Sequence, residues 1–275
     1  MVSARKSTMR AAIAAGWLLA LSSVAQAIDV TGCPTVIPAG EIGVVQADFD
    51  CTQGTPENTA YGIQLGKRAV LDLNGHTITY IQTQYTLSPV LCSSHCEVHG
   101  PGTIVSAPGG GAGIWMQNRN RASIHDLTIT GVTSGIVAVQ GKLEVTNVSI
   151  QASGFGIEAV KKLVLDTVDI TLPAGDGAEC IDADQPGAVV KGADVTVHGC
   201  RTGVHSSGRV DLTRLTVDTS HVGVFASRRL SLTDSTVTGS ELADIYTGRL
   251  PRLINTTCDH SLSLAGAPWG VCASD

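Results

Sequence analysis

Three side chains that can transfer protons stand at the same position of a repeated sequence pattern. Glu158, Asp182 and His205 each directly follow an apolar residue of that pattern. Carboxyl and imidazole groups can act as general acids and bases, and two neighbouring carboxyls can divide these roles. We therefore predict a catalytic centre in which His205 or Glu158 is the base, and Asp182 orients it or stabilises charge.

Aromatic residues occupy the same position elsewhere, at Trp115, Phe225 and Tyr246, and Asp184 follows two residues after Asp182. Aromatic rings suit the apolar faces of sugar rings, so we predict these four residues as a substrate-binding set. The alternative is that outward polar and aromatic side chains alternate along ordinary strands without any function. In that case Trp115 and Tyr246 are packing residues under a loop.

The repeated pattern consists of three short segments, each with apolar residues at i and i+2. In the stretch 135–150 these pairs are Ile136/Ala138, Leu143/Val145 and Val148/Ile150. Such alternation is typical of strands with one buried face. The first apolar residue recurs as an anchor at Ile114, Ile136, Ile157, Ile181, Val204, Val224 and Ile245, in steps of 20 to 24 residues. We predict an all-β parallel solenoid of about nine coils of roughly 22 residues.

Stacking fixes which side chains meet. Each anchor points inward, so the residue after it points outward and lies roughly 4.8 Å from its equivalent on the next coil. A small row between the outward rows should face inward: Met116, Ala138, Ala159, Ala183, Ser206 and Ala226. The predicted catalytic and aromatic residues then form one column. The other outward rows mix charges and hydroxyls and look like ordinary solvated strand faces.

The phrase Val70-Leu-Asp-Leu-Asn-Gly-His-Thr-Ile78 resembles the signature coil of bacterial right-handed parallel β-helix (pectate-lyase-like) repeat proteins. Cys33 and Cys51 also stand where many such proteins have an N-terminal cap. The resemblance covers roughly the whole mature chain and implies a right-handed single-stranded β-helix. It implies no particular activity, because that superfamily includes lyases, hydrolases, epimerases and adhesins. The arginine base of the lyases and the motifs of polygalacturonases and alginate epimerases are missing, so no known catalytic set carries over.

The chain begins with a pattern typical of an export signal. Arg5, Lys6 and Arg10 precede an apolar stretch, and Ala25-Gln-Ala27 supplies a cleavage pattern. We expect a signal peptide at 1–27, an N-terminal cap at 28–61, the β-helix domain at 62–258 and a C-terminal cap at 259–275. The alternative of an uncleaved anchor is disfavoured by the short apolar run. We expect a secreted or periplasmic protein with no membrane insertion after cleavage.

Eight cysteines lie in the exported part, an even number that indicates disulfides in an oxidising compartment. Local spacing suggests the pairs Cys33–Cys51, Cys180–Cys200 and Cys258–Cys272. Cys92 and Cys96 form the weakest pair, because four residues of strand can separate them too far for a bridge. The segment between them could alternatively be a metal site, but nothing nearby supplies further ligands.

Loss of the signal leaves 15 basic against 24 acidic residues, a formal net charge of −9. This charge disfavours nucleic acid and anionic membranes as partners. The segment holding Asp176, Glu179, Asp182 and Asp184 could bind calcium through oxygen ligands, although its spacing matches no defined calcium loop. We predict no metal and no cofactor, with calcium as the alternative.

We expect a monomeric protein that binds or processes an extracellular or cell-envelope polysaccharide, as a lyase or glycoside hydrolase if it is an enzyme. The alternative is a non-catalytic surface solenoid that displays a binding face. Long loops that wall the column favour an enzyme and bare flanks favour display. The chain has only modest insertions, near 83–95, 105–112 and 172–178. An ice-binding solenoid is a third and remote alternative, since the sequence shows no flat repeated Thr-x-Thr array.

Overall fold

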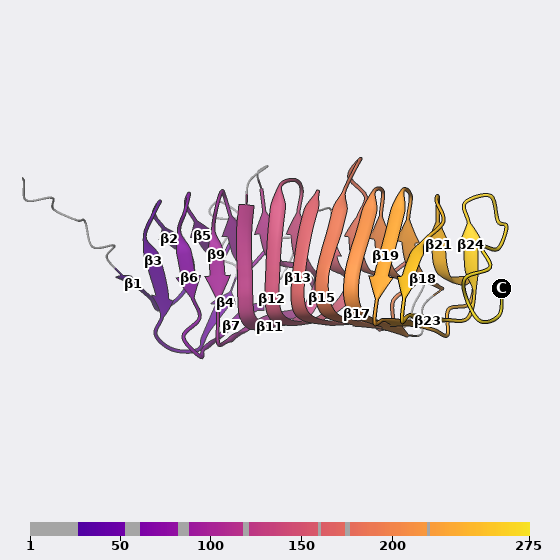
Figure 1. Ribbon diagram of the computed structural model, residues 1–275. Coiled ribbons are helices and arrows are strands. Elements are labelled where there is room, and N and C mark those ends of the chain that lie inside the picture. Colours follow the sequence, from indigo (N-terminus) through magenta and orange to yellow (C-terminus); the bar gives the residue numbers. More distant parts are fainter. Residues whose placement is uncertain are drawn as a thin grey trace, which may run out of the picture.

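The computed structural model describes residues 27–52, 61–81, 88–117, 121–158, 161–173, 177–218 and 221–275. All regular elements in these residues are β-strands, and every pairing between named strands is parallel. One isolated antiparallel bridge, between Leu262 and Pro268, lies outside these pairings. Figure 1 shows the strands stacked along a rod from β1 at one end to β24 at the other. The prediction of an all-β parallel β-helix solenoid is confirmed. The predicted signal peptide lies almost wholly outside the described residues.

Each coil has three faces, which are named by the segments of one coil. Face 1 contains Ile136–Ala138, face 2 contains the stretch 142–146 and face 3 contains the stretch 148–151. The alternating pattern of the sequence explains this division, because each short apolar pair lines the interior behind only one face of a coil. Stacking on the next coil then buries these side chains and satisfies the strand's backbone groups.

The strands divide among the faces as follows. Face 1 has β2 (Thr35–Ile37), β5 (Ile63–Leu65), β8 (Val90–Cys92), β14 (Glu179–Ala183), β16 (Thr202–Ser206), β18 (Val222–Ala226), β21 (Ala243–Thr247) and β24 (Ser261–Ser263). Face 2 has β1 (Ala27–Val30), β3 (Ile42–Val45), β6 (Val70–Asp72), β9 (Glu97–His99), β19 (Arg229–Thr233) and β22 (Arg252–Ile254). Face 3 has β4 (Phe49–Thr52), β7 (Thr77–Ile81), β20 (Thr236–Val237) and β23 (Thr257–Cys258).

Six longer strands bend around a corner and serve more than one face. β13 (Lys162–Thr171), β15 (Val189–His198) and β17 (Arg209–Asp218) cover faces 2 and 3. β10 (Thr103–Met116) covers faces 3 and 1, while β11 (Arg121–Ala138) and β12 (Lys142–Glu158) cover all three.

The predicted register is the observed one. The seven anchors from Ile114 to Ile245 pair in one column along face 1, and each is fully buried. The described members of the small row, Met116, Ala138, Ala183, Ser206 and Ala226, are also buried, and Ala159 lies outside the described residues. Burying one Ile, Leu or Val contributes about 1.5–3 kcal/mol, so the aliphatic columns hold the coils together.

A turn between faces 2 and 3 repeats in a way that the sequence did not reveal. In eight of these turns one non-glycine residue adopts a left-handed backbone conformation, with φ between 48° and 61°. These residues are Asn74, Asp126, Asn147, Thr167, Asp194, Arg214, Asp234 and Asn255. We call them the turn column. Asn and Asp tolerate this conformation best, which explains why they occupy most of its positions.

The solenoid pattern extends into both predicted caps. Within 28–61, β2, β3 and β4 pair with β5, β6 and β7 in parallel register. Near the C-terminus, β24 pairs with β21 in the same way. The periodicity is hard to see in these regions, because strands of three or four residues contain at most two apolar positions on one face.

All three predicted disulfides are present, with Cα–Cα distances of 5.2 Å for Cys33–Cys51, 5.6 Å for Cys180–Cys200 and 5.1 Å for Cys258–Cys272. The doubtful pair, Cys92 and Cys96, is also bonded, at a Cα–Cα distance of 5.9 Å. A turn of the chain between β8 and β9 brings these two cysteines together. Four such pairs indicate an oxidising environment. Within the described part of the chain, no helix is long and apolar enough to cross a membrane.

Candidate functional site

The predicted site residues lie in one outward column on face 1. Trp115 pairs with Val137, Val137 with Glu158, and Glu158 with Asp182. The column continues through His205, Phe225 and Tyr246 on the next three coils. Glu158, Asp182 and His205 are all half-buried, because each rises from a buried strand between the side chains of its two neighbours. Alternation along each strand therefore positions all three groups on the same face.

His205 is at the centre of a cluster of carboxylates. Its Nδ1 atom lies 2.9 Å from Oδ1 of Asp182 and 3.5 Å from Oε2 of Glu179. These ion pairs, that with Asp182 first and that with Glu179 second, raise the pKa of His205 to about 9. At neutral pH the imidazole is therefore a cation that donates protons. This protonation state suits an acid or a charge stabiliser better than the base predicted for this residue.

Glu158 lies on the coil before Asp182. Unlike the imidazole of His205, its carboxyl is neutral when protonated and negative when ionised. Burial raises the pKa of its carboxyl, and the negative charge of Asp182 raises it further. The hydroxyl of Ser134, which donates to Glu158 Oε2 over 3.5 Å, acts in the other direction. The shift moves Glu158 toward the protonated form that a general acid needs. Two neighbouring carboxyls can divide the roles of acid and base, and the raised pKa of Glu158 is in the direction that such a division needs.

Glu179 belongs to the cluster, although the sequence suggested it only as a possible calcium ligand. It begins β14, where it pairs with Phe155 on the preceding coil and Thr202 on the following coil. Its carboxylate reaches His205 diagonally across one coil step. Strand alternation gives no cue to this contact, since Glu179 precedes the inward anchor Ile181 by two residues and would be expected to face inward, whereas its side chain is only partly buried.

The aromatic residues are unequally placed. The ring of Phe225 lies edge-on to His205 at a centroid distance of 4.8 Å, and Tyr246 lies edge-on to Phe225 at 5.5 Å. Both rings therefore extend the cluster along face 1. Trp115 stands in the same column, but the buried Val137 separates it from Glu158. Asp184 is exposed and its Oδ1 accepts from Gln185, so it lies beside the cluster and not within it.

One group of described residues brings three potential ligand atoms within 4.8 Å of one another: Glu179, Asp182 and His205. Calcium takes six to eight oxygen ligands, and this group offers two carboxylates and a nitrogen. Asp184 does not belong to it, and Asp176 lies outside the described residues. The geometry therefore gives little support to the calcium alternative, and the absence of a metal stays a prediction.

The column on face 1 can therefore provide protonated and ionised groups side by side on three successive coils. The rings of Phe225 and Tyr246 continue the same column on the next two coils. This arrangement also concentrates carboxyl groups, because Glu179 and Asp182 contact His205 and Glu158 is the neighbour of Asp182 on the preceding coil. No family model, no curated protein and no solved structure matches this chain.

Proposed function

We propose that the protein binds and processes an extracellular or cell-envelope polysaccharide on face 1. One observation carries this proposal: Glu158 and His205, on either side of Asp182, both have raised pKa values. Titratable groups with perturbed pKa values that share one exposed face are typical of catalytic sites. Phe225 and Tyr246 then provide apolar surface for sugar rings next to the reacting bond.

The chemistry favours a glycoside hydrolase over a lyase. Glu158 would protonate the oxygen of the leaving sugar as the glycosidic bond breaks, and Asp182 would act on the opposite side as nucleophile or as base toward water. His205 would balance the negative charge of Asp182 through their ion pair. A lyase needs a base that abstracts a proton from a uronate. The cationic His205 already carries its proton and cannot serve as that base, and the acid-rich face disfavours an anionic substrate.

The oxidising environment indicated by four disulfides and the predicted export signal support a substrate outside the cytoplasm. The resemblance to β-helix repeat proteins supports a polysaccharide, since many members of that superfamily act on such polymers. These two observations concern the location and the substrate of the protein. The proposed reaction itself rests on the cluster of Glu158, Asp182 and His205.

The second candidate is a non-catalytic solenoid that displays face 1 as a binding surface. The short connections beside the column favour it. Only two residues separate β16 from β17, and two separate β18 from β19. At this edge of face 1 the described connections are therefore too short to form a wall, and a bound polymer would remain open to water there.

The test is to incubate the mature protein with a panel of neutral and acidic polysaccharides and to measure new reducing ends, unsaturated uronates and binding. We expect new reducing ends from a neutral polymer, and a loss of at least about tenfold in Asp182→Asn and Glu158→Gln. Asp166→Asn, which removes an exposed carboxylate from face 2, is the matched control and should keep full activity. Binding without cleavage, abolished by Asp182→Asn, would establish the display function instead. If the protein neither binds nor cleaves any polymer of the panel, both candidate functions are refuted.

A further inference from the structure

Face 3 carries a second regular column, formed mainly by hydroxyl side chains. Parallel pairing aligns one outward residue from each successive strand of this face. The residues are Thr77, Thr103, Thr128, Ser149, Asp169, Thr196, Thr216, Thr236 and Thr257. We call them the hydroxyl column. Inspection of the sequence did not show it, because unequal coil lengths hide the alignment.

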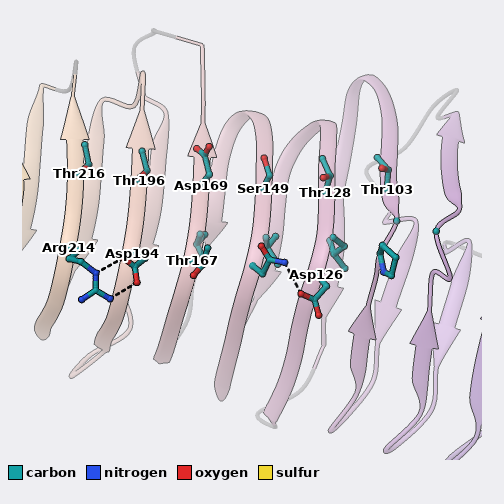
Figure 2. Close-up of a pocket in the computed structure, with 17 residues that line it drawn as sticks. Thr103, Asp126, Thr128, Ser149, Thr167, Asp169, Asp194, Thr196, Arg214 and Thr216 are labelled. Carbon is teal, nitrogen blue, oxygen red and sulfur yellow. Dashed lines mark hydrogen bonds and ion pairs between the residues drawn. The ribbon is translucent and has the colours of Figure 1, made fainter.

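A groove of about 840 Å³ runs along the middle of this column. Figure 2 shows its two walls: a row from Thr103 to Thr216 along the hydroxyl column, and a second row that contains Asp126, Thr167, Asp194 and Arg214 of the turn column. The buried side chains of Leu127, Val148 and Val168 also line it and lie between the two rows in sequence. The groove is therefore apolar at its base and polar on both sides. Five coil steps of roughly 4.8 Å give the row from Thr103 to Thr216 a length of roughly 24 Å.

The hydroxyl groups of this groove are available to a ligand. Within the described residues, those of Thr103, Thr128, Ser149, Thr196 and Thr216 have no hydrogen-bond partner in the protein. This differs from the turn column, where Asn147 donates to Asp126 over 2.8 Å and Asn255 donates to Asp234 over 2.9 Å. One column thus stabilises the coil stack with its polar groups, and the other leaves its polar groups free.

The charges of the groove disfavour an anionic ligand. Arg214 is its one cation among the described lining residues, and Asp194 binds it through two hydrogen bonds of 2.5 Å. Asp126 accepts from Asn147 and contacts His125, while Asp169 is an exposed acidic residue. A phosphate, sulfate or uronate polymer would therefore meet net negative charge and no free cation.

We propose that this groove binds a linear, uncharged glycan whose chain lies along the axis of the solenoid. The regular free hydroxyls would exchange hydrogen bonds with the hydroxyls of successive sugars, and the apolar base would contact their C–H faces. The length of the row fits a polymer better than a single small ligand. This groove is on a different face from Glu158, Asp182 and His205, so it holds the chain independently of any reaction on face 1.

The experiment measures retention of the mature protein by cellulose, chitin and a soluble mixed-linkage glucan, with polygalacturonate and heparin as anionic probes. Thr128→Arg and Ser149→Arg would fill the groove with a long cationic side chain. The double variant Thr128→Val/Thr196→Val keeps the side-chain shape and removes two hydroxyls. We expect retention by at least one neutral glycan and a loss of at least about tenfold in all three variants.

A control distinguishes this groove from other surfaces. Thr213→Arg makes the same change at an outward position of face 2 and should bind as wild type. Thermal melts establish that each variant is folded. The proposal is overturned if no neutral glycan retains the protein, if only anionic probes do, or if the folded groove variants bind like wild type. Inhibition of ice recrystallisation that depends on Thr128, without glycan binding, would also overturn it and assign the column to ice.

Discussion

At the scale of single residues, the decisive group is His205. Its imidazole has two carboxylate partners on face 1, and the ring of Phe225 covers it on the side of the next coil. The partners explain why its pKa is raised to about 9 although partial burial acts in the opposite direction. The same carboxylates give the cluster its acidic character, so the properties of Glu158 and His205 are coupled through Asp182.

Replacement of Asp182 by Asn should lower the pKa of His205 from about 9 toward its ordinary value of 6.5, because the first of its two carboxylate partners becomes neutral. Histidine-ring NMR signals followed over pH would measure the shift. Asp169→Asn on face 3 is the control and should leave this titration unchanged. A wild-type His205 that titrates near 6.5 would contradict the described ion pairs.

The ion pair between His205 and Asp182 also makes the stability of the fold depend on pH. A histidine with a raised folded-state pKa stabilises the fold fully below its unfolded pKa of 6.5, and this contribution is lost as pH rises through about 9. Thermal melts of wild type should therefore decline between pH 6.5 and 9 more than those of His205→Ala. Parallel declines in both proteins would show that the pair contributes nothing measurable.

The sequence was sufficient to predict that Glu158, Asp182 and His205 share one column, because the spacing from their anchors defines the register. It was not sufficient to predict that His205 is cationic, since that depends on the distance from Nδ1 to two carboxylates. Glu179 was missed as a partner for a related reason. Its contact with His205 runs diagonally between coils, and a periodic pattern describes only direct neighbours.

At the scale of strands, the buried columns determine stability. Replacement of Ile157 by Asp would put an unpaired carboxylate into the core between two coils, which costs several kcal/mol. Val164→Asp is the matched change at an outward position, where Val164 pairs with Glu144 and Lys191 on neighbouring coils. It should change the melting temperature little. Equal melting temperatures for the two variants would show that the register is wrong.

Glycines before the anchors are required for close stacking. A Cβ atom on Gly135 would lie 2.5 Å from the carbonyl oxygen of Gly156 on the next coil and would also contact Ile150. Gly135→Ala should therefore reduce the free energy of unfolding by about 1–3 kcal/mol in denaturant melts. Gly32→Ala is the control, because nothing lies within 4 Å of its added Cβ. Equal stability of both variants would contradict the described packing.

Sequence periodicity predicted the aliphatic columns because Ile, Val and Leu repeat as a class at constant spacing. The turn column was not predictable in this way. Its members share a backbone conformation but include Asn, Asp, Thr and Arg, so no single residue type marks the position. The hydroxyl column was not predictable either, because only the register of the folded coils shows that its hydroxyls are aligned.

At the scale of the whole molecule, disulfides stabilise both ends of the solenoid. Cys33–Cys51 joins β4 to the chain before β2, and Cys258–Cys272 ties the C-terminal segment to β23. Next to the second bridge, the carboxylate of Asp275 accepts hydrogen bonds from the amides of Val271 and Cys272. These contacts cover the last coil, where the stack would otherwise end with an open edge.

Loss of the last bridge in Cys258→Ser/Cys272→Ser should cost about 2–4 kcal/mol of unfolding free energy. Denaturant melts of the variant and of wild type would measure the difference. Mass spectrometry of the protein purified without reductant should also find no free thiol, since all eight cysteines are paired. More than two free thiols would contradict the described pairing.

The central claim is that a polysaccharide contacts face 1 at His205. It is tested most directly by histidine-ring NMR of the mature protein, titrated with a soluble fragment of the polysaccharide that the panel identifies. We predict that the ring signal of His205 shifts in proportion to occupancy, and that this response is absent in Asp182→Asn. A His205 signal that stays unmoved while the fragment saturates the protein would contradict the claim.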